Sequence, residues 1–590
     1  MTCLRGAVRA AVRAAVRAAV RAAVVLALLL ALGACSTVPM SSSTVQITQA
    51  PARPAEVVGI EPLPPERGAT PEEIVRSFID AAASVRPGHP VAREHLTPEA
   101  AGSWSDEADI TVISPGYATV TTETGAVEVT ANPVGTVDAR GVFSVAEADT
   151  FTRRFTLEQV RDEWRITDPP DGLIILEPDF QRVYEEVAAY FVDPTGQRLV
   201  PDPRYVIAGE ALPTALVERL LAGPSAALAA GVRNPLNGAQ LRSAVTLDGQ
   251  AAVVDLTGLP TEPAPVLSEV AAQLVWTLSQ LRNVLVQSVE IRVDGEPVGI
   301  DDVPDEQTVE HWAGFDPDAV PRESVGHYIE AGALHTVSAG EPTPGPAGTG
   351  VYGLSEAAVS IDPATGEPDL LVGVRSDAGG ATLLAGPYAG DLAPVLSAGR
   401  VSAPTVSATR SEAWAVADGT SVVRVQPGGP PQPVTTPTLP GLGLAEVLRL
   451  SPDGVRAALV VEGPGGRSLY VGTVVRAEDG SVALRDFRAV APDLSRVVDV
   501  AWEDSASLLV LAGDPGEERI VPYAVGVDGW GLSDVPTAGL PSQPRSIAAA
   551  PNKQPLVNAG GTIWQLAGGT WVTLVRGQEP LPGTAPFYPL

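Results

Sequence analysis

Cysteine, lysine and histidine are scarce in this chain of 590 residues. Only Cys3 and Cys35 occur, which excludes a disulfide framework and a cysteine-rich metal site. Lys553 is the single lysine beside 38 arginines, and no Gly-Lys-Ser/Thr phosphate-binding loop is present. The five histidines form no His-Glu-x-x-His motif, and no Gly-x-Ser-x-Gly nucleophile motif exists. The sequence therefore predicts a protein that is not an enzyme, without catalytic, cofactor-binding or metal-binding residues.

Positive charge is also in deficit. The chain carries 39 basic residues against 70 acidic ones, a net charge of −31 at pH 7. Nucleic-acid binding depends on basic surfaces, so we expect no nucleic-acid partner. Hydrophobic residues make up 45% of the chain, enough for sizeable cores, and the length corresponds to roughly four domains of ~150 residues.

The N-terminal 34 residues differ from the rest because they contain no acid. They hold five arginines spaced by four, followed by the apolar run Ala22 to Leu32. A basic stretch followed by a short apolar run is typical of a secretory signal peptide. Eleven apolar residues are too few for a membrane-spanning helix, which needs about 20.

The residues that follow this run, Leu32-Gly33-Ala34-Cys35, resemble a bacterial lipobox. The resemblance implies that Cys35 becomes the mature N-terminus and carries N-palmitoyl and S-diacylglycerol groups. Acyl chains contribute ~0.8 kcal/mol per buried CH₂, so they would hold the protein at the cell membrane, on its extracytoplasmic face. The exported chain has 34 basic and 70 acidic residues, a net charge of −36.

The pattern of residues predicts a multidomain, mainly β protein. Its expected parts are a signal peptide (1–34), a lipidated tether (35–69), an α+β domain (70–182), a second α+β domain (183–300), an acidic linker (301–324) and a β-propeller of five to six blades (325–590). The first domain opens with Thr70-Pro71-Glu72-Glu73, a helix-capping sequence. Strands follow, and a helix before a curved sheet is similar to the cone-shaped domains called NTF2-like. We expect its polar set to be solvated rather than a ligand site: Asp109, Glu123, Asp162 and Glu163.

The second domain alternates strands with an apolar helix. Its characteristic phrases resemble a GerMN domain: Tyr190-Phe191-Val192-Asp193, Leu220-Leu221-Ala222-Gly223-Pro224, Val254-Asp255-Leu256, Trp276-Thr277-Leu278 and Val293-Asp294-Gly295-Glu296-Pro297. The next residues, Asp301 to Glu306, hold four carboxylates in six positions and predict a solvated hinge.

The last 266 residues repeat, with a turn after the first strand of each unit at Asp362, Arg410, Asp453, Asp504 and Asn552. Units of about 40–50 residues with four short strands are typical of propeller blades. The hairpin around Tyr328 to Val337 is expected to complete a fifth blade or to begin a sixth. We interpret the loop Asp362 to Asp369 as a blade turn, since it lacks calcium-loop spacing.

The order of these parts, the GerMN phrases and Ser451-Pro452-Asp453-Gly454 within the propeller repeat resemble the actinobacterial LpqB lipoprotein family over essentially the whole chain. The resemblance implies an accessory protein of the MtrA–MtrB two-component system. Such a protein binds the extracellular domain of the sensor histidine kinase MtrB and modulates it in cell-envelope homeostasis and division.

Two other functions stay open at this point. A peptidoglycan or other glycan binder would stack sugars on the propeller tryptophans, Trp414, Trp502, Trp530, Trp564 and Trp571, although packing within the blades is the favoured interpretation. A hydrolase would need two carboxylates about 5–9 Å apart.

The lipobox yields a direct test. Cys35→Ala removes the only acceptor of the diacylglycerol group, so the variant should stay unprocessed or be shed into the medium. Mass spectrometry of the mature protein reports the outcome. An unmodified N-terminal residue other than Cys35 in the wild-type protein would contradict the anchor.

Overall fold

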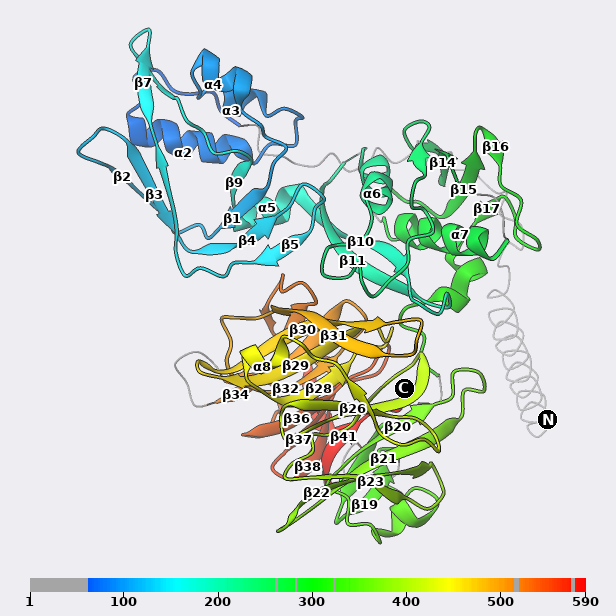
Figure 1. Cartoon of the computed structure of the whole chain (residues 1–590). Coiled ribbons are helices and arrows are strands. Elements are labelled where there is room, and N and C mark those ends of the chain that lie inside the picture. The colour runs from blue at the N-terminus through cyan, green and yellow to red at the C-terminus, as the bar shows by residue number, and fades with distance from the viewer. Residues whose placement is uncertain are drawn as a thin grey trace, which may run out of the picture. The chain divides into compact units, whose positions relative to one another are not determined.

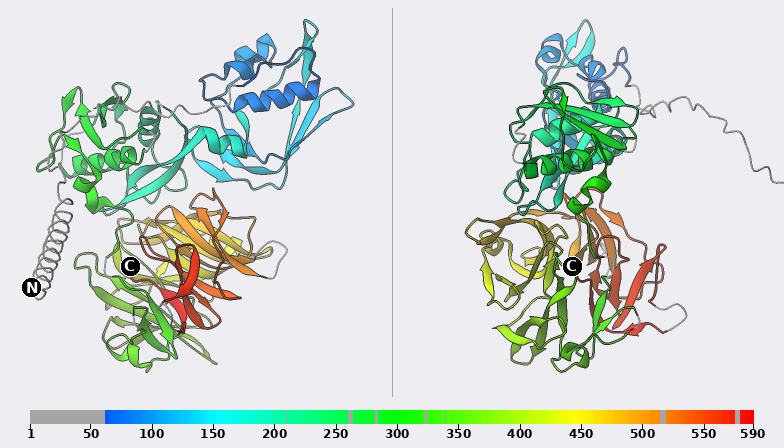
Figure 2. Two further views of the ribbon diagram at one scale, coloured as in Figure 1. Left: turned by 180° about the vertical axis from the view of Figure 1, so that it is seen from behind. Right: turned by 90° about the vertical axis from the view of Figure 1, so that its right-hand side faces the viewer.

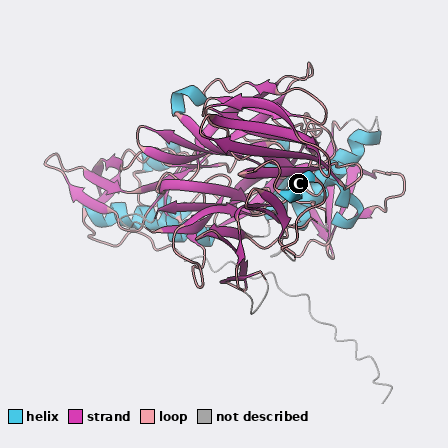
Figure 3. Ribbon diagram, turned by 90° about the horizontal axis from the view of Figure 1, so that it is seen from below, coloured by secondary structure: helices cyan, strands magenta, loops and turns pink. Residues whose placement is uncertain are grey.

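The computed structural model describes residues 62–590, except 210, 260–263, 282–283, 322–323, 339, 514–518 and 575–578. The signal peptide, Cys35 and most of the tether lie outside the described residues. All described residues belong to one compact unit. Strands dominate it, as predicted (Figures 1 and 3).

An α+β domain comes first. Its helices are α2 (Pro71–Ala82), α3 (Pro90–Arg93), α4 (Pro98–Ser103) and α5 (Glu177–Val183). Its strands are β1 (Ile110–Ile113), β2 (Ala118–Thr121), β3 (Val127–Ala131), β4 (Pro133–Val137), β5 (Phe143–Val145), β6 (Phe151–Phe155), β7 (Leu157–Val160), β8 (Glu163–Ile166) and β9 (Leu173–Leu176). They form the sheets β5-β4-β1-β9, β2-β3-β6 and β7-β8.

Helix α2 begins where the capping sequence predicts. The Thr70 hydroxyl accepts a hydrogen bond from the Glu73 backbone N–H, and the Glu73 carboxylate accepts one from the Thr70 N–H at 2.8 Å. Capping of this kind contributes about 1 kcal/mol. The predicted apolar face is buried against the sheets: Ile74, Val75, Phe78, Ala81 and Ala82.

The four polar residues in this domain do not form a ligand site. Asp109, Glu123 and Asp162 are exposed, and Glu163 is half-buried and accepts a hydrogen bond from the Gly68 N–H. The prediction of a solvated set is therefore confirmed. Strands β4, β5 and β9 escaped prediction, and in β4 the reason is that Pro133 and Gly135 interrupt the β-rich pattern that marks its neighbours.

The second domain, called here the middle domain, also mixes helices and strands. Its elements are β10 (Tyr184–Val192), β11 (Leu199–Ile207), α6 (Leu212–Leu221), β12 (Gln240–Leu241), β13 (Thr246–Asp248), β14 (Ala251–Thr257), α7 (Ala264–Ser279), β15 (Ser288–Val293), β16 (Glu296–Pro297), β17 (Glu306–Gln307) and the 3-10 helix η1 (Val309–Phe315). Strands β14 and β15 pair in parallel, joined through α7.

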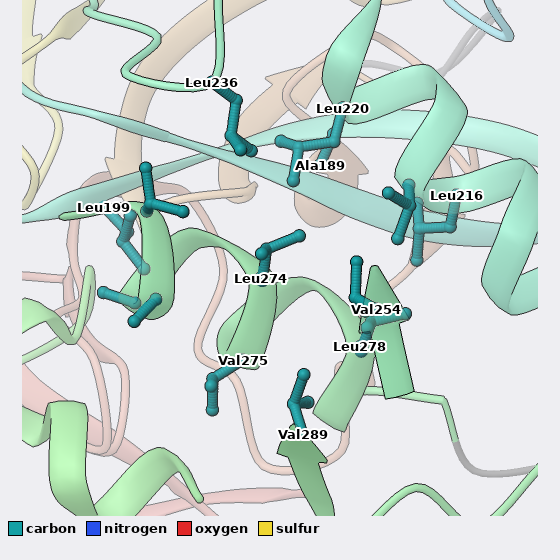
Figure 4. Close-up of a cluster of buried hydrophobic side chains, with 14 of the residues drawn as sticks. Ala189, Leu199, Leu216, Leu220, Leu236, Val254, Leu274, Val275, Leu278 and Val289 are labelled. Atoms are coloured by element: carbon teal, nitrogen blue, oxygen red, sulfur yellow. The ribbon is translucent and has the colours of Figure 1, made fainter. Parts of the chain in front are cut away.

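Helix α7 is the centre of the middle domain. Figure 4 shows its side chains Leu274, Val275 and Leu278 among residues of the surrounding strands and of α6. Polar side chains of the helix and of Gln280, which directly follows it, also hydrogen-bond the free edge of β10. The Thr277 hydroxyl accepts from the Tyr190 N–H at 3.2 Å, and the Gln280 amide bonds both backbone groups of Ala188 at 2.6 and 2.7 Å. The helix thereby covers an edge that could otherwise pair with another chain.

The acidic linker differs from its expected form. Its carboxylates Asp301, Asp302, Asp305 and Glu306 are exposed, as the charge pattern indicates. The other described residues of the linker, however, do not form a solvated hinge. Strand β17 pairs with β15, and Trp312 of η1 packs into the middle-domain core with its indole N–H donated to the Gln307 side chain at 3.0 Å. Burial of one large aromatic outweighs the charge pattern at the start of the segment.

The remaining residues form six sheets. The first four are β20 (Glu356–Ile361) to β23 (Ala393–Ala398), β24 (Thr405–Ser407) to β27 (Gln432–Val434), β28 (Leu444–Leu450) to β31 (Val482–Ala489), and β32 (Ser495–Trp502) to β35 (Ser533–Asp534). The middle strands of these four sheets are β21 (Pro368–Asp377), β22 (Gly380–Pro387), β25 (Arg410–Ala417), β26 (Ser421–Val425), β29 (Arg456–Gly463), β30 (Gly466–Arg476), β33 (Ser507–Gly513) and β34 (Ile520–Gly526). The short helix α8 (Leu439–Leu442) precedes β28.

The fifth and sixth sheets complete the series. The fifth holds β36 (Pro544–Ala548), β37 (Leu556–Ala559), β38 (Thr562–Ala567), β39 (Thr570–Thr573) and β40 (Leu581–Pro582). The sixth joins β18 (His327–Glu330) and β19 (Ala333–Thr336), which precede the 3-10 helix η2 (Pro346–Thr349), to β41 (Thr584–Phe587) from the end of the chain.

These sheets form a closed ring (Figure 2). The inner strands contact one another in the order β20, β24, β28, β32, β36 and β41, and β41 contacts β20 again. The Leu590 N–H and C=O also bond Val359 and Ile361 of β20. The structure thus confirms a propeller, and the predicted hairpin around Tyr328 to Val337 belongs to a sixth blade.

Ring closure by β41 can be tested by deleting residues 584–590. The deletion removes the partner of β18 and the inner strand between β20 and β36, so we expect proteolysis within the β18–β19 hairpin and loss of cooperative propeller unfolding. Val351→Ala is the control, because Val351 is 68% exposed and its truncation should change stability by less than about 0.5 kcal/mol. Unchanged unfolding after the deletion would contradict the closure.

Candidate functional site

A buried polar network links the propeller to the middle domain. The turn Ser451-Pro452-Asp453-Gly454 after β28 is a β-turn, as predicted, with Gly454 at a φ of 71°. The Asp453 carboxylate accepts from the Val455 N–H at 2.9 Å, and the Ser451 hydroxyl accepts from the Arg456 N–H at 2.9 Å. All four residues of the turn are buried, so the turn contacts other parts of the protein as well as reversing the chain.

Arg456 connects this turn to the middle domain. Its side chain is almost fully buried, with Nη1 3.4 Å from the Asp453 carboxylate. Nη2 donates to the Pro201 carbonyl of β11, and Nη1 donates to the Ser505 carbonyl at 3.5 Å. A buried guanidinium is stable only when its charge is paired and its N–H groups are hydrogen-bonded. Arg456 therefore fixes the turn, the next blade and β11 in one arrangement.

Close packing surrounds this network. Val455 belongs to the hydrophobic core of the middle domain, although it lies in the propeller chain. The Thr473 hydroxyl donates to the Ala227 carbonyl at 2.7 Å. A Cβ at Gly231 would come within 2.6 Å of the Thr473 methyl group and 2.9 Å of a Val455 methyl group, so any larger residue there would force these side chains to shift. We call this set of contacts the junction.

The former linker also takes part in the junction. The Asp318 carboxylate accepts from the Ser505 N–H at 2.8 Å and from the Ser505 hydroxyl at 2.7 Å. Burial raises the pKa of Asp318 to about 6, and the nearby Asp504 adds to the effect. Arg198 donates to the Ala319 carbonyl at 2.7 Å and to Ala408 of the propeller at 3.4 Å.

A propeller loop also contacts the first domain. Trp530 lies between β34 and β35, with its ring centroid 5.0 Å from that of Phe143 and 5.2 Å from that of Phe180. Asp528 of the same loop accepts from the Tyr205 hydroxyl of β11 at 3.1 Å. Trp530 was expected to pack within a blade, and that expectation is wrong because its loop projects away from the sheet onto other aromatic side chains.

The other four propeller tryptophans lie on strands of the blades, and Trp564 among them is half-buried. Trp414, Trp502 and Trp571 are buried within the blades, as predicted. Their indole N–H groups donate to Glu412, to the Arg449 carbonyl and to the Pro536 carbonyl. A buried indole offers no face to a sugar, so Trp414 and Trp571 do not form a glycan-stacking platform, whereas Trp502 lines the cavity at the centre of the propeller.

The centre of the propeller holds a second feature, a cavity of about 70 Å³ that opens to solvent. Residues of the inner strands line it, among them Glu356 and Arg449. Arg449 pairs with Asp499 of the next blade at 3.1 Å. Asp499 also accepts from the Val500 and Ile547 N–H groups at 3.0 and 2.9 Å, so its oxygens are occupied.

The residues singled out from the sequence have different outcomes. Cys35 lies outside the described residues, so the lipidation site stays a prediction. The loop at Asp362 is a turn in which the carboxylate accepts from the Ala364 N–H at 2.9 Å. Within the described ranges, no group of three or more acidic, histidine or cysteine side chains could hold a metal ion. No described helix is long and apolar enough to span a bilayer.

Sequence reasoning missed the residues that matter most at these sites. Arg456 and Asp528 resemble ordinary surface charges in the sequence, and nothing local reveals their distant partners. Arg449 and Asp499 did leave a signal, since each stands between apolar residues on an inner strand, in Leu448-Arg449-Leu450 and Val498-Asp499-Val500. A charge inside such a strand marks a position that needs a specific partner.

The fold and the junction define a multidomain protein in which a GerMN-like domain is fixed on a β-propeller. Family models cover nearly all of the described chain: the lipoprotein LpqB N-terminal domain at residues 64–181, the sporulation and spore germination domain at 188–299 and the lipoprotein LpqB β-propeller domain at 332–589. The chain belongs to the LpqB lipoprotein family.

Curated relatives agree with this assignment. The chain is 32% identical to lipoprotein LpqB of Rhodococcus opacus over 508 residues, which cover 81% of this chain and 82% of the relative. It is 30% identical to that of Mycolicibacterium smegmatis over 604 residues, covering 95% and 97%. It is 31% identical to that of Mycobacterium tuberculosis over 560 residues, covering 88% and 90%.

Similarity to solved structures is weaker. TolB from Acinetobacter baumannii matches 59% of this chain and 98% of its own length, at 12% identity and a TM-score of 0.28. The tandem GerMN domains of GerM from Bacillus subtilis match 21% of this chain and 47% of their own length, at 18% identity and a TM-score of 0.17. Likenesses at this level support no functional conclusion.

The junction predicts a large effect of Arg456→Ala. The variant leaves the buried Asp453 carboxylate unpaired and removes the bond to Pro201, so the free energy of unfolding should fall by about 3–5 kcal/mol. Chemical denaturation measures the change. Arg467→Ala in the same blade is the control. Arg467 pairs with Glu462 through exposed side chains, and its loss should cost less than about 1 kcal/mol. Equal effects of the two variants would contradict the role of Arg456.

Proposed function

We propose that this chain is a lipid-anchored extracytoplasmic protein that binds the extracellular domain of a two-component sensor histidine kinase of the MtrB kind and modulates it. Membership of the LpqB family supports an envelope lipoprotein. The kinase partner follows from the family resemblance. The observation that carries the proposal is the junction together with the Trp530 contact, because these contacts hold three domains against one another.

Rigid placement of the domains favours binding of a folded partner. A specific interface buries about 1,600 Å² in total, and surfaces that are already ordered lose less entropy on association. Arg456, Asp318 and Trp530 hold the domains through contacts far apart in the sequence. A partner that contacts two domains would therefore meet both in a fixed arrangement.

Anchoring places this surface at the membrane. With Cys35 acylated, the exported chain would carry a net charge of −36 on a tether. Anionic lipid headgroups repel such a body. We therefore expect the folded domains to stand away from the bilayer, at the height of a receptor's extracellular domain.

Neither alternative function gains a specific observation. Burial of Trp414 and Trp571 leaves those residues unable to stack on a glycan. A two-carboxylate hydrolase would need both acids to face its substrate. Glu356 lines the propeller cavity, whereas Asp499 is paired with Arg449 and accepts hydrogen bonds from two backbone N–H groups. These two carboxylates therefore do not form such a pair.

The kinase proposal can be tested with the exported chain, residues 36–590, and an immobilised kinase ectodomain. Biolayer interferometry should show saturable binding by the wild-type protein. Arg456→Ala should weaken it at least tenfold, about 1.4 kcal/mol, because the domains no longer present one surface. Arg467→Ala should bind like the wild type.

The two failures have different meanings. Absence of saturable wild-type binding would contradict the kinase partner. Undiminished binding by Arg456→Ala would contradict only the role of the junction, provided that unfolding experiments show the variant's domains to be loosened.

A further inference from the structure

A carboxylate joins the segment after η1 to the propeller. Asp318 lies in this segment, which Trp312 of η1 ties to the middle-domain core. Its carboxylate accepts hydrogen bonds from the Ser505 N–H at 2.8 Å and from the Ser505 hydroxyl at 2.7 Å. Both bonds go to the same oxygen, Oδ1, so Oδ2 accepts neither of them. The Asp318–Ser505 contact therefore bridges two domains and leaves one carboxylate oxygen able to carry a proton.

Two further carboxylates stand beside this contact, one from each domain. Asp316 belongs to the same turn as Asp318, and its carboxylate accepts from the Asp318 N–H at 2.9 Å. Asp504 directly precedes Ser505 in the turn after β32, and its carboxylate accepts from the Ala506 N–H at 2.8 Å. When Asp318 is ionised, three negative charges therefore meet across the boundary between the domains. Like charges at a half-buried place disfavour the ionised form.

The positive groups at this contact are engaged elsewhere. Arg198 donates to the Ala319 carbonyl at 2.7 Å, and Arg456 donates to the Ser505 carbonyl at 3.5 Å. Among the ion pairs of the described residues, neither arginine pairs with Asp318. The Asp318 charge is therefore held by hydrogen bonds from one serine and not by a guanidinium.

The electrostatics agree with this geometry. Burial raises the pKa of Asp318 to about 6, Asp504 and Asp316 act in the same direction, and its hydrogen bonds oppose them. Burial and Asp504 also raise the pKa of Glu503, so this neighbour adds no positive charge. Tyr190 of β10 faces the same acids, and burial raises its pKa, so its hydroxyl stays neutral.

The sign of the pH effect follows from these values. Away from the propeller, the Asp318 carboxyl would have its ordinary pKa of 3.8, and in the contact its pKa is about 6. The contact therefore binds a proton more tightly than the separated groups do. Its stability is fully present below about pH 4 and is lost as the pH rises through about 6.

We propose that the Asp318–Ser505 contact is a pH-sensitive switch between the propeller and the middle domain. With a proton on Oδ2, Asp318 still accepts both hydrogen bonds on Oδ1 and no longer repels Asp316 and Asp504. When the carboxyl ionises, this repulsion loosens the contact. The segment also bonds the end of the chain through Ser324, so loosening extends toward the sixth blade. The switch does not depend on the kinase partner proposed above.

Hydrogen–deuterium exchange on the exported chain, residues 36–590, tests the switch. The Ser505 amide reports the contact directly, because its N–H donates to Asp318. Mass spectrometry measures its protection, corrected for the pH dependence of the intrinsic exchange rate. Raising the pH from about 5 to about 7.5 should lower the protection about tenfold, as pKa values of about 6 in the contact and 3.8 outside it require. Equal protection at both pH values, or greater protection at the higher one, would overturn the proposal.

Asp318→Asn separates this carboxyl from the other acids of the protein. The asparagine oxygen still accepts from Ser505 but does not titrate, so protection of the Ser505 amide should be the same at both pH values. Asp305→Asn is the matched control, because Asp305 lies exposed in the same linker and its loss should leave the tenfold change intact. A tenfold change that persists in Asp318→Asn would assign the pH effect to other groups and overturn the proposal. The wild-type comparison gives an answer even if Asp318→Asn folds poorly.

Discussion

The buried guanidinium of Arg456 is the interaction on which the arrangement of this protein most depends. It closes the Ser451-Pro452-Asp453-Gly454 turn of one blade, contacts the next blade at Ser505 and donates to β11 of the middle domain. Burying a charge is costly, and the cost is offset only while all of these partners stay in place. The charge therefore specifies one relative placement of propeller and middle domain, whereas apolar packing around Val455 would tolerate several.

Local chemistry explains which parts of the fold could be predicted. The capping box at Thr70 and the stripe of apolar residues on α7 depend on neighbours within one or two turns of helix, so they are readable from the sequence. The propeller repeat is readable because each blade uses a similar turn. Strand β11 was missed because Pro201 and Pro203 argue against a strand, yet the structure accommodates both beside β10 and buries the pair Asp202–Arg204.

The sites could not be predicted to the same extent, because their partners are far apart in the sequence. Arg456 meets Pro201 across 255 residues, and Tyr205 meets Asp528 across 323. No periodicity or motif encodes such a distance. The cavity depends on ring closure in the same way, since Glu356, Arg449 and Ile547 become neighbours only when six blades surround one axis. The charged residues Arg449 and Asp499 on inner strands were the local sequence feature that pointed to this part of the propeller.

Closure of the propeller and the junction share one segment of chain. The residues after η1 bond the propeller through Asp318, and six positions later the Ser324 hydroxyl donates to the Pro589 carbonyl, next to the residue that pairs with β20. The hairpin β18–β19 then completes the sixth blade with β41. Opening the ring would therefore remove the contact of Ser324 and weaken the position of the nearby Asp318, which fixes the middle domain. Loss of the junction would in turn weaken the position of β18 and β19 in the sixth blade. The stability of the ring and the relative placement of the domains are thus physically coupled through the contacts of Asp318 and Ser324.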